Sequence, residues 1–259
     1  MLMEWILLFG AGVLGGILNS IAGGGSFITF PALMFVGLPA IAANATNTFA
    51  VCAGYLSGAY GFRQDISQSA TKLPTIIVLS LVGGALGAYL LLKVSEQQFL
   101  VAIPWLLLFA TLLFLFGHRL SYWLTKAARA TSLHPVWTTI AISLLLLLVS
   151  SYGGFFNAGL GVIVLSYLVL AGYSDINQMN GLKLLVSSCV SVIAIAVFML
   201  DGVIDWQKGA AVMLGTLVGG YVAARVSRQV EQKYVKGFVA LSSIFMTLYF
   251  FIDVYWPKS

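Results

Sequence analysis

The chain has 259 residues, of which 60% are hydrophobic and only 8% are charged, and its mean hydropathy is +1.00. Soluble domains carry about 25% charged residues, so this composition excludes a soluble globular protein and predicts an all-α polytopic membrane protein in contact with the lipid bilayer. The formal charge of +5 is typical of basic loops that face the cytoplasm and does not indicate a nucleic-acid partner.

The first predicted element covers residues 5–36, which is too long for one crossing and too rich in glycine for one helix. Its centre is the sequence NSIAGGGS at residues 19–26. Glycine costs about 1 kcal/mol relative to alanine inside a helix, so the cluster predicts a break between two half-helices. No basic stretch precedes the segment, so we expect it to belong to the mature protein and not to a cleaved signal peptide.

Charge-free runs of about the length of a membrane span follow at residues 42–62, 73–92 and 97–117. A more polar linker at 118–135 leads to a second long, glycine-rich segment at 136–172, whose centre is YGGFFNAGLG at 152–161. Three more apolar runs then cover residues 176–200, 209–224 and 237–252. This order predicts a first membrane repeat at 1–117, a cytoplasmic linker at 118–135 and a second membrane repeat at 136–259.

The two repeats share sequence as well as element order. Residues 81–84, Leu-Val-Gly-Gly, recur as 217–220 at an offset of 136, and residues 15–19 align with 153–157 at an offset of 138. Further identities at the offset of 136 pair Asn44 with Asn180, Asp65 with Asp201, Phe109 with Phe245, and Thr111 with Thr247. Ordered matches over such a length indicate an internal duplication.

The distribution of positive charge favours two inverted repeats, each with a broken or re-entrant opening helix plus three transmembrane helices. If each opening segment returns to its own side, one side of the membrane carries nine basic residues: Arg63, Lys72, Arg119, Lys126, Arg129, Arg225, Arg228, Lys233 and Lys236. The other side carries only Lys93, Lys208 and Lys258. A single crossing per opening segment would give a split of seven against five, which the positive-inside rule disfavours.

The inverted arrangement places both termini outside the cytoplasm. Two short full crossings in each opening segment would also give each repeat an odd number of membrane crossings, and hence the same orientation. The sequence therefore leaves a re-entrant hairpin and a pair of short crossings as alternatives.

Interrupted helices at matching positions of inverted repeats are typical of secondary transporters, which bind their substrate near the middle of the bilayer. The free N–H groups and positive dipole ends of half-helices favour an anion. Lys183 is the only charged residue in the run 176–200, and a buried ammonium requires a partner, a cavity or a ligand. The predicted anion-binding residues are Asn19, Ser20, Gly23, Gly24, Gly25, Ser26, Asn44, Asn47, Asn157, Gly159, Gly161, Asn180 and Lys183.

Structural roles are the alternative for several of these residues. The glycine clusters could serve close helix packing, the asparagines could bridge helices, and Lys183 could reach the membrane surface from a helix end. Glycine-rich faces around Gly83 and Gly219 favour packing within the chain or a homodimer contact. A passive anion channel and a non-transporting assembly factor remain alternative functions.

No metal, cofactor or catalytic site is predicted. His118 and His134 have no cysteine or carboxylate neighbours, and motifs for intramembrane hydrolysis or nucleotide binding are missing from the sequence. We therefore expect a protein that is not an enzyme.

At its motifs the chain resembles the TauE/SafE sulfite exporter family, a group of small bacterial membrane proteins with duplicated halves. The resemblance rests on residues 19–26 with Pro31 after them, on the Asn-Ala-Thr-Asn motif at 44–47, on Gly159 and Gly161, and on Asn-Gly-Leu-Lys at 180–183. It implies transport, in particular export, of sulfite, sulfoacetate or other sulfonates across the bacterial inner membrane.

Overall fold

A computed structural model describes residues 2–21, 23–130, 135–226 and 232–256. Over these residues the fold is entirely helical, as the composition predicts. Its eleven helices, in chain order, are α1 (Leu2–Ile21), α2 (Ser26–Phe35), α3 (Ala40–Gly61), α4 (Arg63–Ser67), α5 (Leu73–Lys93), α6 (Glu96–Ala130), α7 (Pro135–Phe155), α8 (Leu160–Leu170), α9 (Ile176–Leu200), α10 (Trp206–Val226) and α11 (Gln232–Tyr255).

Six of the described helices are long and apolar enough to cross a membrane: α1, α5, α6, α7, α9 and α11. This makes the chain a multi-pass membrane protein. Helices α3 and α10, which the charge-free runs also predict as spans, have matching lengths of 22 and 21 residues but fall outside this set. Helix α3 buries Asn44, Thr46, Asn47 and Thr48, and α10 has Gln207 and Lys208 in its first turn, so polar side chains lower the hydropathy of both.

The predicted linker at 118–135 is largely helical. Helix α6 continues without interruption to Ala130, and α7 begins at Pro135. Residues 118–130 contain neither glycine nor proline, so nothing in their sequence ends the helix that starts at Glu96. The end of the apolar run 97–117 therefore does not mark a helix end.

Both opening segments are interrupted where the glycines cluster. Helix α1 has 20 residues and α2 has 10, while α7 has 21 and α8 has 11. Gly23 and Gly159 adopt left-handed φ values of +81° and +78°, which side chains disfavour. The prediction of two half-helices is thus corrected to one long and one short helix, and α8 begins at Leu160, ahead of Gly161.

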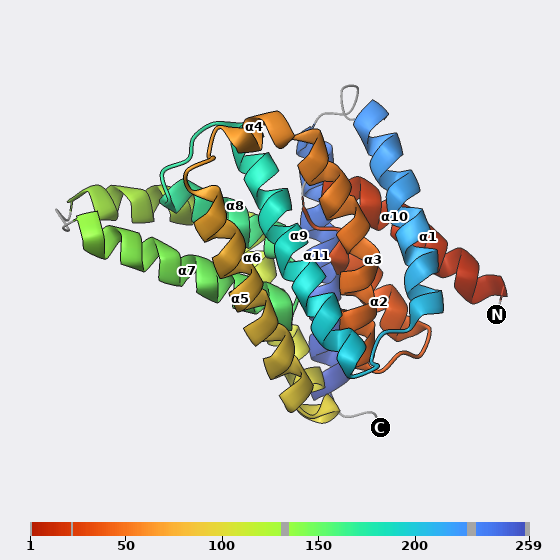
Figure 1. The fold of residues 1–259 in the computed structure, drawn as a ribbon. Helices are drawn as coiled ribbons and strands as arrows, with labels where there is room; N and C mark the ends of the chain where they lie inside the picture. The colour runs from red at the N-terminus through yellow and green to blue at the C-terminus, as the bar shows by residue number, and fades with distance from the viewer. Residues whose placement is uncertain (1, 22, 131–134, 227–231, 257–259) are drawn as a thin grey trace.

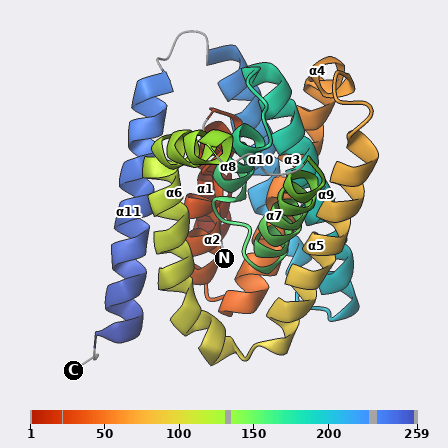
Figure 2. The ribbon, with the colours of Figure 1, turned by 90° about the vertical axis from the view of Figure 1, so that its left-hand side faces the viewer.

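Equivalent helices of the two repeats make equivalent contacts. Helix α1 packs against α10, and its counterpart α7 packs against α5; α3 contacts its own counterpart α9, and α6 contacts α11. Figure 2 shows α6 and α11 side by side at one edge of the bundle. The hydroxyl oxygens of Thr111 and Thr247, which occupy the same position in the two repeats, lie 3.2 Å apart. Contacts between equivalent residues are expected next to a two-fold axis.

Glycine lets these helix pairs approach closely. A Cβ atom built on Gly16 of α1 would lie 2.8 Å from the Cα atom of Thr216 on α10, and one built on Gly87 of α5 would lie 2.7 Å from the backbone nitrogen of Phe155 on α7. Gly83 and Gly219 meet α7 and α1 in the same way. The glycine-rich faces therefore serve packing within the chain.

The connections between helices gather at two ends of the bundle. In Figure 1, α4 and the α8–α9 connection lie at the top, whereas the α2–α3, α5–α6 and α9–α10 connections lie at the bottom, near the C-terminus. Helices α2 and α8 run from the interior toward opposite ends. The two breaks are thereby placed inside the bundle.

Candidate functional site

The two breaks meet in the interior of the protein. A Cβ atom built on Gly161 would lie 3.5 Å from the carbonyl oxygen and 3.6 Å from the Cα atom of Gly23. These two glycines are equivalent at the offset of 138, and both are buried. Because neither carries a side chain, the start of α8 approaches the end of α1 at backbone distance.

Lys183 lies beside this meeting point. Its side chain is only 5% exposed, and its Cδ atom would lie 3.5 Å from a Cβ on Gly161. The Nζ atom donates a hydrogen bond of 3.3 Å to Oδ1 of Asn180, and no carboxylate among the described residues forms an ion pair with it. The side chain does not extend to lipid. A buried ammonium with a single neutral partner is costly and predisposes the position to bind an anion.

Backbone donors without acceptors surround the breaks. Within the described ranges, the amides of Gly24, Gly25 and Ser26 at the first break and of Gly159 and Gly161 at the second have no hydrogen-bond acceptor. These amides sit at or just before the first turns of α2 and α8. Free N–H groups at helix starts attract anions.

Asn157 joins the second break to both central helices. Its Oδ1 atom accepts a hydrogen bond of 3.1 Å from the Tyr55 hydroxyl, and its Nδ2 atom donates one of 3.3 Å to Oγ of Ser191. Asn19 is half-buried beside the first break, where a Cβ atom built on Gly25 would lie 2.9 Å from the Cβ atom of Asn19. Tyr55 was absent from the predicted set, although its equivalence to the polar Ser191 at the offset of 136 could have indicated it.

Asn44 and Asn47 are almost completely buried on one face of α3. Nδ2 of Asn44 donates to the carbonyl oxygen of Phe155 at 3.1 Å, and Oδ1 of Asn47 accepts a short hydrogen bond from the hydroxyl of Thr29. Among the described residues, the remaining atoms, Oδ1 of Asn44 and Nδ2 of Asn47, have no partner. Thr29 is a second contributor that the predicted set lacks.

Ser20 lies at the surface of α1, unlike the buried residues of the predicted set. It is exposed, donates a hydrogen bond of 2.9 Å to the carbonyl oxygen of Gly16, and lies next to Gly220 of α10. Its hydroxyl therefore serves the α1 helix and the α1–α10 contact. Gly159 is buried and is the N-cap residue of α8, so it lies at the second break itself.

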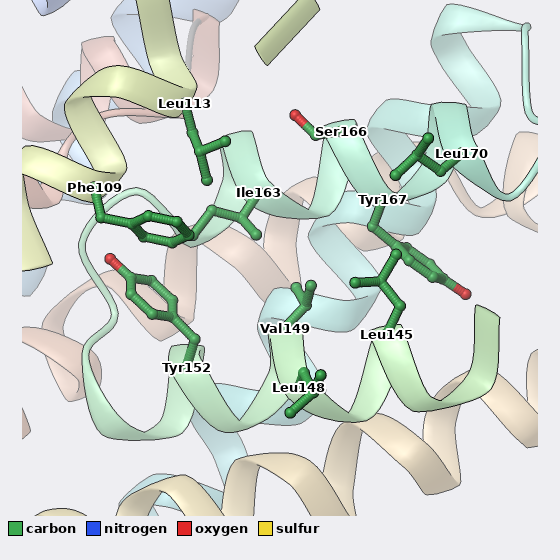
Figure 3. Close-up of a pocket in the computed structure, with 10 residues that line it drawn as sticks. All are labelled: Phe109, Leu113, Leu145, Leu148, Val149, Tyr152, Ile163, Ser166, Tyr167 and Leu170. Carbon is green, nitrogen blue, oxygen red and sulfur yellow. The ribbon is translucent and has the colours of Figure 1, made fainter. Parts of the chain in front are cut away.

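A separate cavity of about 370 Å³ lies between α6, α7 and α8 (Figure 3). Phe109 and Leu113 come from α6, four residues from α7, and Ile163, Ser166, Tyr167 and Leu170 from α8. None of the predicted anion-binding residues lines it, and its lining carries no charge. Its chemistry therefore does not suit an anion.

A family model described as "Sulfite exporter TauE/SafE" matches residues 8–250. A "Probable membrane transporter protein" of Haemophilus influenzae is 28% identical over 251 residues, which cover 96% of this chain and 95% of that protein. The "Probable membrane transporter protein YfcA" of Escherichia coli K12 is 28% identical, covering 93% and 87%. The "Probable membrane transporter protein ORF9" of Sinorhizobium sp is 27% identical, covering 95% and 92%. No solved structure shows significant similarity to the chain.

Proposed function

Since the chain belongs to the sulfite exporter TauE/SafE family and is related to probable membrane transporters along nearly its whole length, we propose that it is a secondary transporter that exports small organosulfur anions such as sulfite, sulfoacetate or other sulfonates. The family description supports the sulfur chemistry. The ammonium of Lys183, which has no carboxylate partner among the described residues, and the amides that lack an acceptor within the same residues support an anion.

In this proposal the substrate binds where the two breaks meet. Lys183 neutralises its charge, and the amides of Gly24, Gly25, Ser26, Gly159 and Gly161 donate hydrogen bonds to its oxygen atoms. The single observation that carries the proposal is the buried Lys183, which lies beside Gly161 without a carboxylate among the described residues. An anion would supply the missing counter-charge.

The proposed mechanism is alternating access in the bacterial inner membrane, with two inverted repeats and both termini outside the cytoplasm. Charge supports this orientation, because it places nine basic residues on the cytoplasmic side and only three on the other. Arg63 is the first residue of α4, at the opposite end of the bundle from the α5–α6 and α9–α10 connections, where Lys93 ends α5 and Lys208 lies in the first turn of α10 (Figure 1). One repeat rocks against the other around the shared site. The binding site thereby opens to each side of the membrane in turn.

The test is transport of radiolabelled sulfite or sulfoacetate by purified protein in lipid vesicles. Lys183→Met removes the charge but keeps an unbranched apolar side chain, so we expect uptake to fall at least about 10-fold, the equivalent of one charge-assisted hydrogen bond. Lys208→Met is the matched control, because Lys208 lies 3.3 Å from Asp205 near the surface and should retain uptake. Unchanged anion flux in the Lys183 variant would reject the assigned role.

Counterflow distinguishes the carrier from a passive channel. A carrier exchanges external label for unlabelled internal substrate and saturates, whereas a channel only dissipates the gradient. We expect saturable exchange, because a continuous pore would expose the central polar residues to water. These residues are at most 5% exposed: Asn44, Asn47, Asn157 and Lys183. Flux without exchange would favour the channel.

A further inference from the structure

The two repeats contribute unequal polar groups at equivalent positions beside the breaks. In the second repeat these are Asn180 and Lys183, here called the charged half-site. In the first repeat the same positions, at the offset of 136, are Asn44 and Asn47, here called the amide half-site. We propose that the substrate is bifunctional: its anionic end binds the charged half-site, and a neutral group that both donates and accepts hydrogen bonds binds the amide half-site.

The amide half-site is built but incomplete. Asn47 is 0% and Asn44 is 1% exposed, and Thr29 and the carbonyl of Phe155 fix one atom of each side chain. The atoms that remain are one acceptor, Oδ1 of Asn44, and one donor, Nδ2 of Asn47; neither has a partner among the described residues. Residues three apart in a helix share a face, so one group placed against that face could pair with both atoms.

This pair selects the chemistry of the occupant. A sulfonate or carboxylate oxygen would satisfy Nδ2 of Asn47, but it has no hydrogen for Oδ1 of Asn44. A hydroxyl group can do both, since it donates one hydrogen and accepts through its lone pairs. The amide half-site therefore matches an uncharged hydroxyl-like end, and the charged half-site takes the anionic end.

The two half-sites adjoin each other through the breaks. A Cβ atom built on Gly161 would lie 3.5 Å from both the Lys183 side chain and the carbonyl oxygen of Gly23, and Gly23 leads into α2, whose Thr29 holds Asn47. Asn47 and Lys183 each lie seven residues into helices that enter from opposite ends, about 10 Å deep at 1.5 Å per residue. A hydrocarbon core of about 30 Å leaves roughly 10 Å between them. That span suits a short-chain molecule with two functional ends.

The inference rests on the proposed function, and matched sulfonates test it separately. Binding of 2-hydroxyethane-, 3-hydroxypropane- and 4-hydroxybutanesulfonate would be compared with that of the alkanesulfonates of equal chain length, through titration calorimetry on the purified full chain. We expect at least one hydroxylated sulfonate to bind about 10-fold or more tightly than its partner, because a polar site left unpaired rejects the analogue that lacks the group.

Variants assign the preference to the amide half-site. The double substitution Asn44→Leu and Asn47→Leu should bring the affinity ratio within each matched pair close to one, and the milder single changes Asn44→Ser and Asn47→Ser should lower it. Ser80→Ala removes another buried hydroxyl, on α5, that has no partner in the described part of the chain, and it should leave the ratio as in the wild type. Elution as a single peak on size exclusion would confirm that each variant is folded.

Three results would overturn the inference: no hydroxyl preference at any chain length, a preference that survives in the double variant, or loss of the preference in Ser80→Ala. The first would indicate that ordered water satisfies the two asparagines. If neither series binds at all, the proposed function fails with it. Binding of both series without preference rejects the bifunctional substrate alone.

Discussion

Gly159 and Gly161 lie two residues apart at the second break, yet a methyl group would act differently at each. A Cβ on Gly159 would lie 2.6 Å from the Cβ of Ala110, and its φ of +78° strains any other residue. We expect Gly159→Ala to lose about 1–3 kcal/mol of stability, seen as a lower midpoint of thermal unfolding. An unchanged midpoint would mean that α8 can begin without the left-handed turn.

Gly161→Ala should instead affect the ligand. Its new methyl group would lie in ordinary contact, 3.5 Å from both Gly23 and Lys183, within a helix that tolerates alanine better than glycine. We expect a thermal midpoint at least equal to that of the wild type and a smaller stabilisation by added sulfite, since the methyl group covers the proposed binding surface. Full stabilisation by sulfite in this variant would place the anion elsewhere.

The sequence singles out Lys183 and the asparagines because polar groups in apolar runs are costly to bury unless they have a partner or a ligand. It does not indicate Thr29 or Tyr55 directly, since a hydroxyl on a helix becomes informative only when its neighbours across the fold are known. It also cannot tell which atom of each asparagine remains unpaired. That depends on the positions of Phe155 and Thr29, which tertiary packing decides.

Among the elements, α1 offers a matched pair of glycines. A Cβ on Gly16 would lie 2.8 Å from the Cα atom of Thr216, whereas a Cβ on Gly10 meets nothing within 4 Å. We expect Gly16→Ala to cost roughly 1–3 kcal/mol by separating α1 from α10, and Gly10→Ala to be neutral or stabilising by up to about 1 kcal/mol. Thermal unfolding of the two variants in the same detergent measures the difference. Equal midpoints would contradict close α1–α10 packing.

The existence of the breaks could be predicted from glycine clusters, but the helix lengths around them could not. Glycine marks where a helix is weakest, and packing decides on which side of the cluster the chain stays helical. Helix α1 therefore continues through four glycines, of which Gly12 and Gly16 lie against α10. The extension of α6 to Ala130 was missed because polarity, and not a helix-breaking residue, suggested a linker.

For the whole molecule, the proposed orientation predicts the location of three points in the chain. A reporter enzyme that is active only outside the cytoplasm should work when fused at either terminus and fail when inserted between Ala130 and Pro135. The reason is that the first repeat crosses the membrane an odd number of times when its opening segment re-enters. Activity at the insertion site together with activity at the termini would exclude an odd number of membrane crossings in the first repeat.

The duplication was visible in the sequence because ordered identities recur at offsets of 136 and 138. The sequence could not indicate which equivalent residues touch. Gly23 with Gly161 and Thr111 with Thr247 do so, while Asn47 and Lys183 each contact a short helix, α2 or α8. Such contacts depend on how the helices of the two predicted repeats pack against each other.

The most direct test of the central claim is an electron cryomicroscopy structure of the full chain in saturating methanesulfonate. The account predicts density for one anion between the first turns of α2 and α8, with an oxygen atom about 3 Å from Nζ of Lys183 and another near the amide of Gly161. Density only in the apolar cavity beside Phe109, or an empty site between the breaks at saturation, would contradict it.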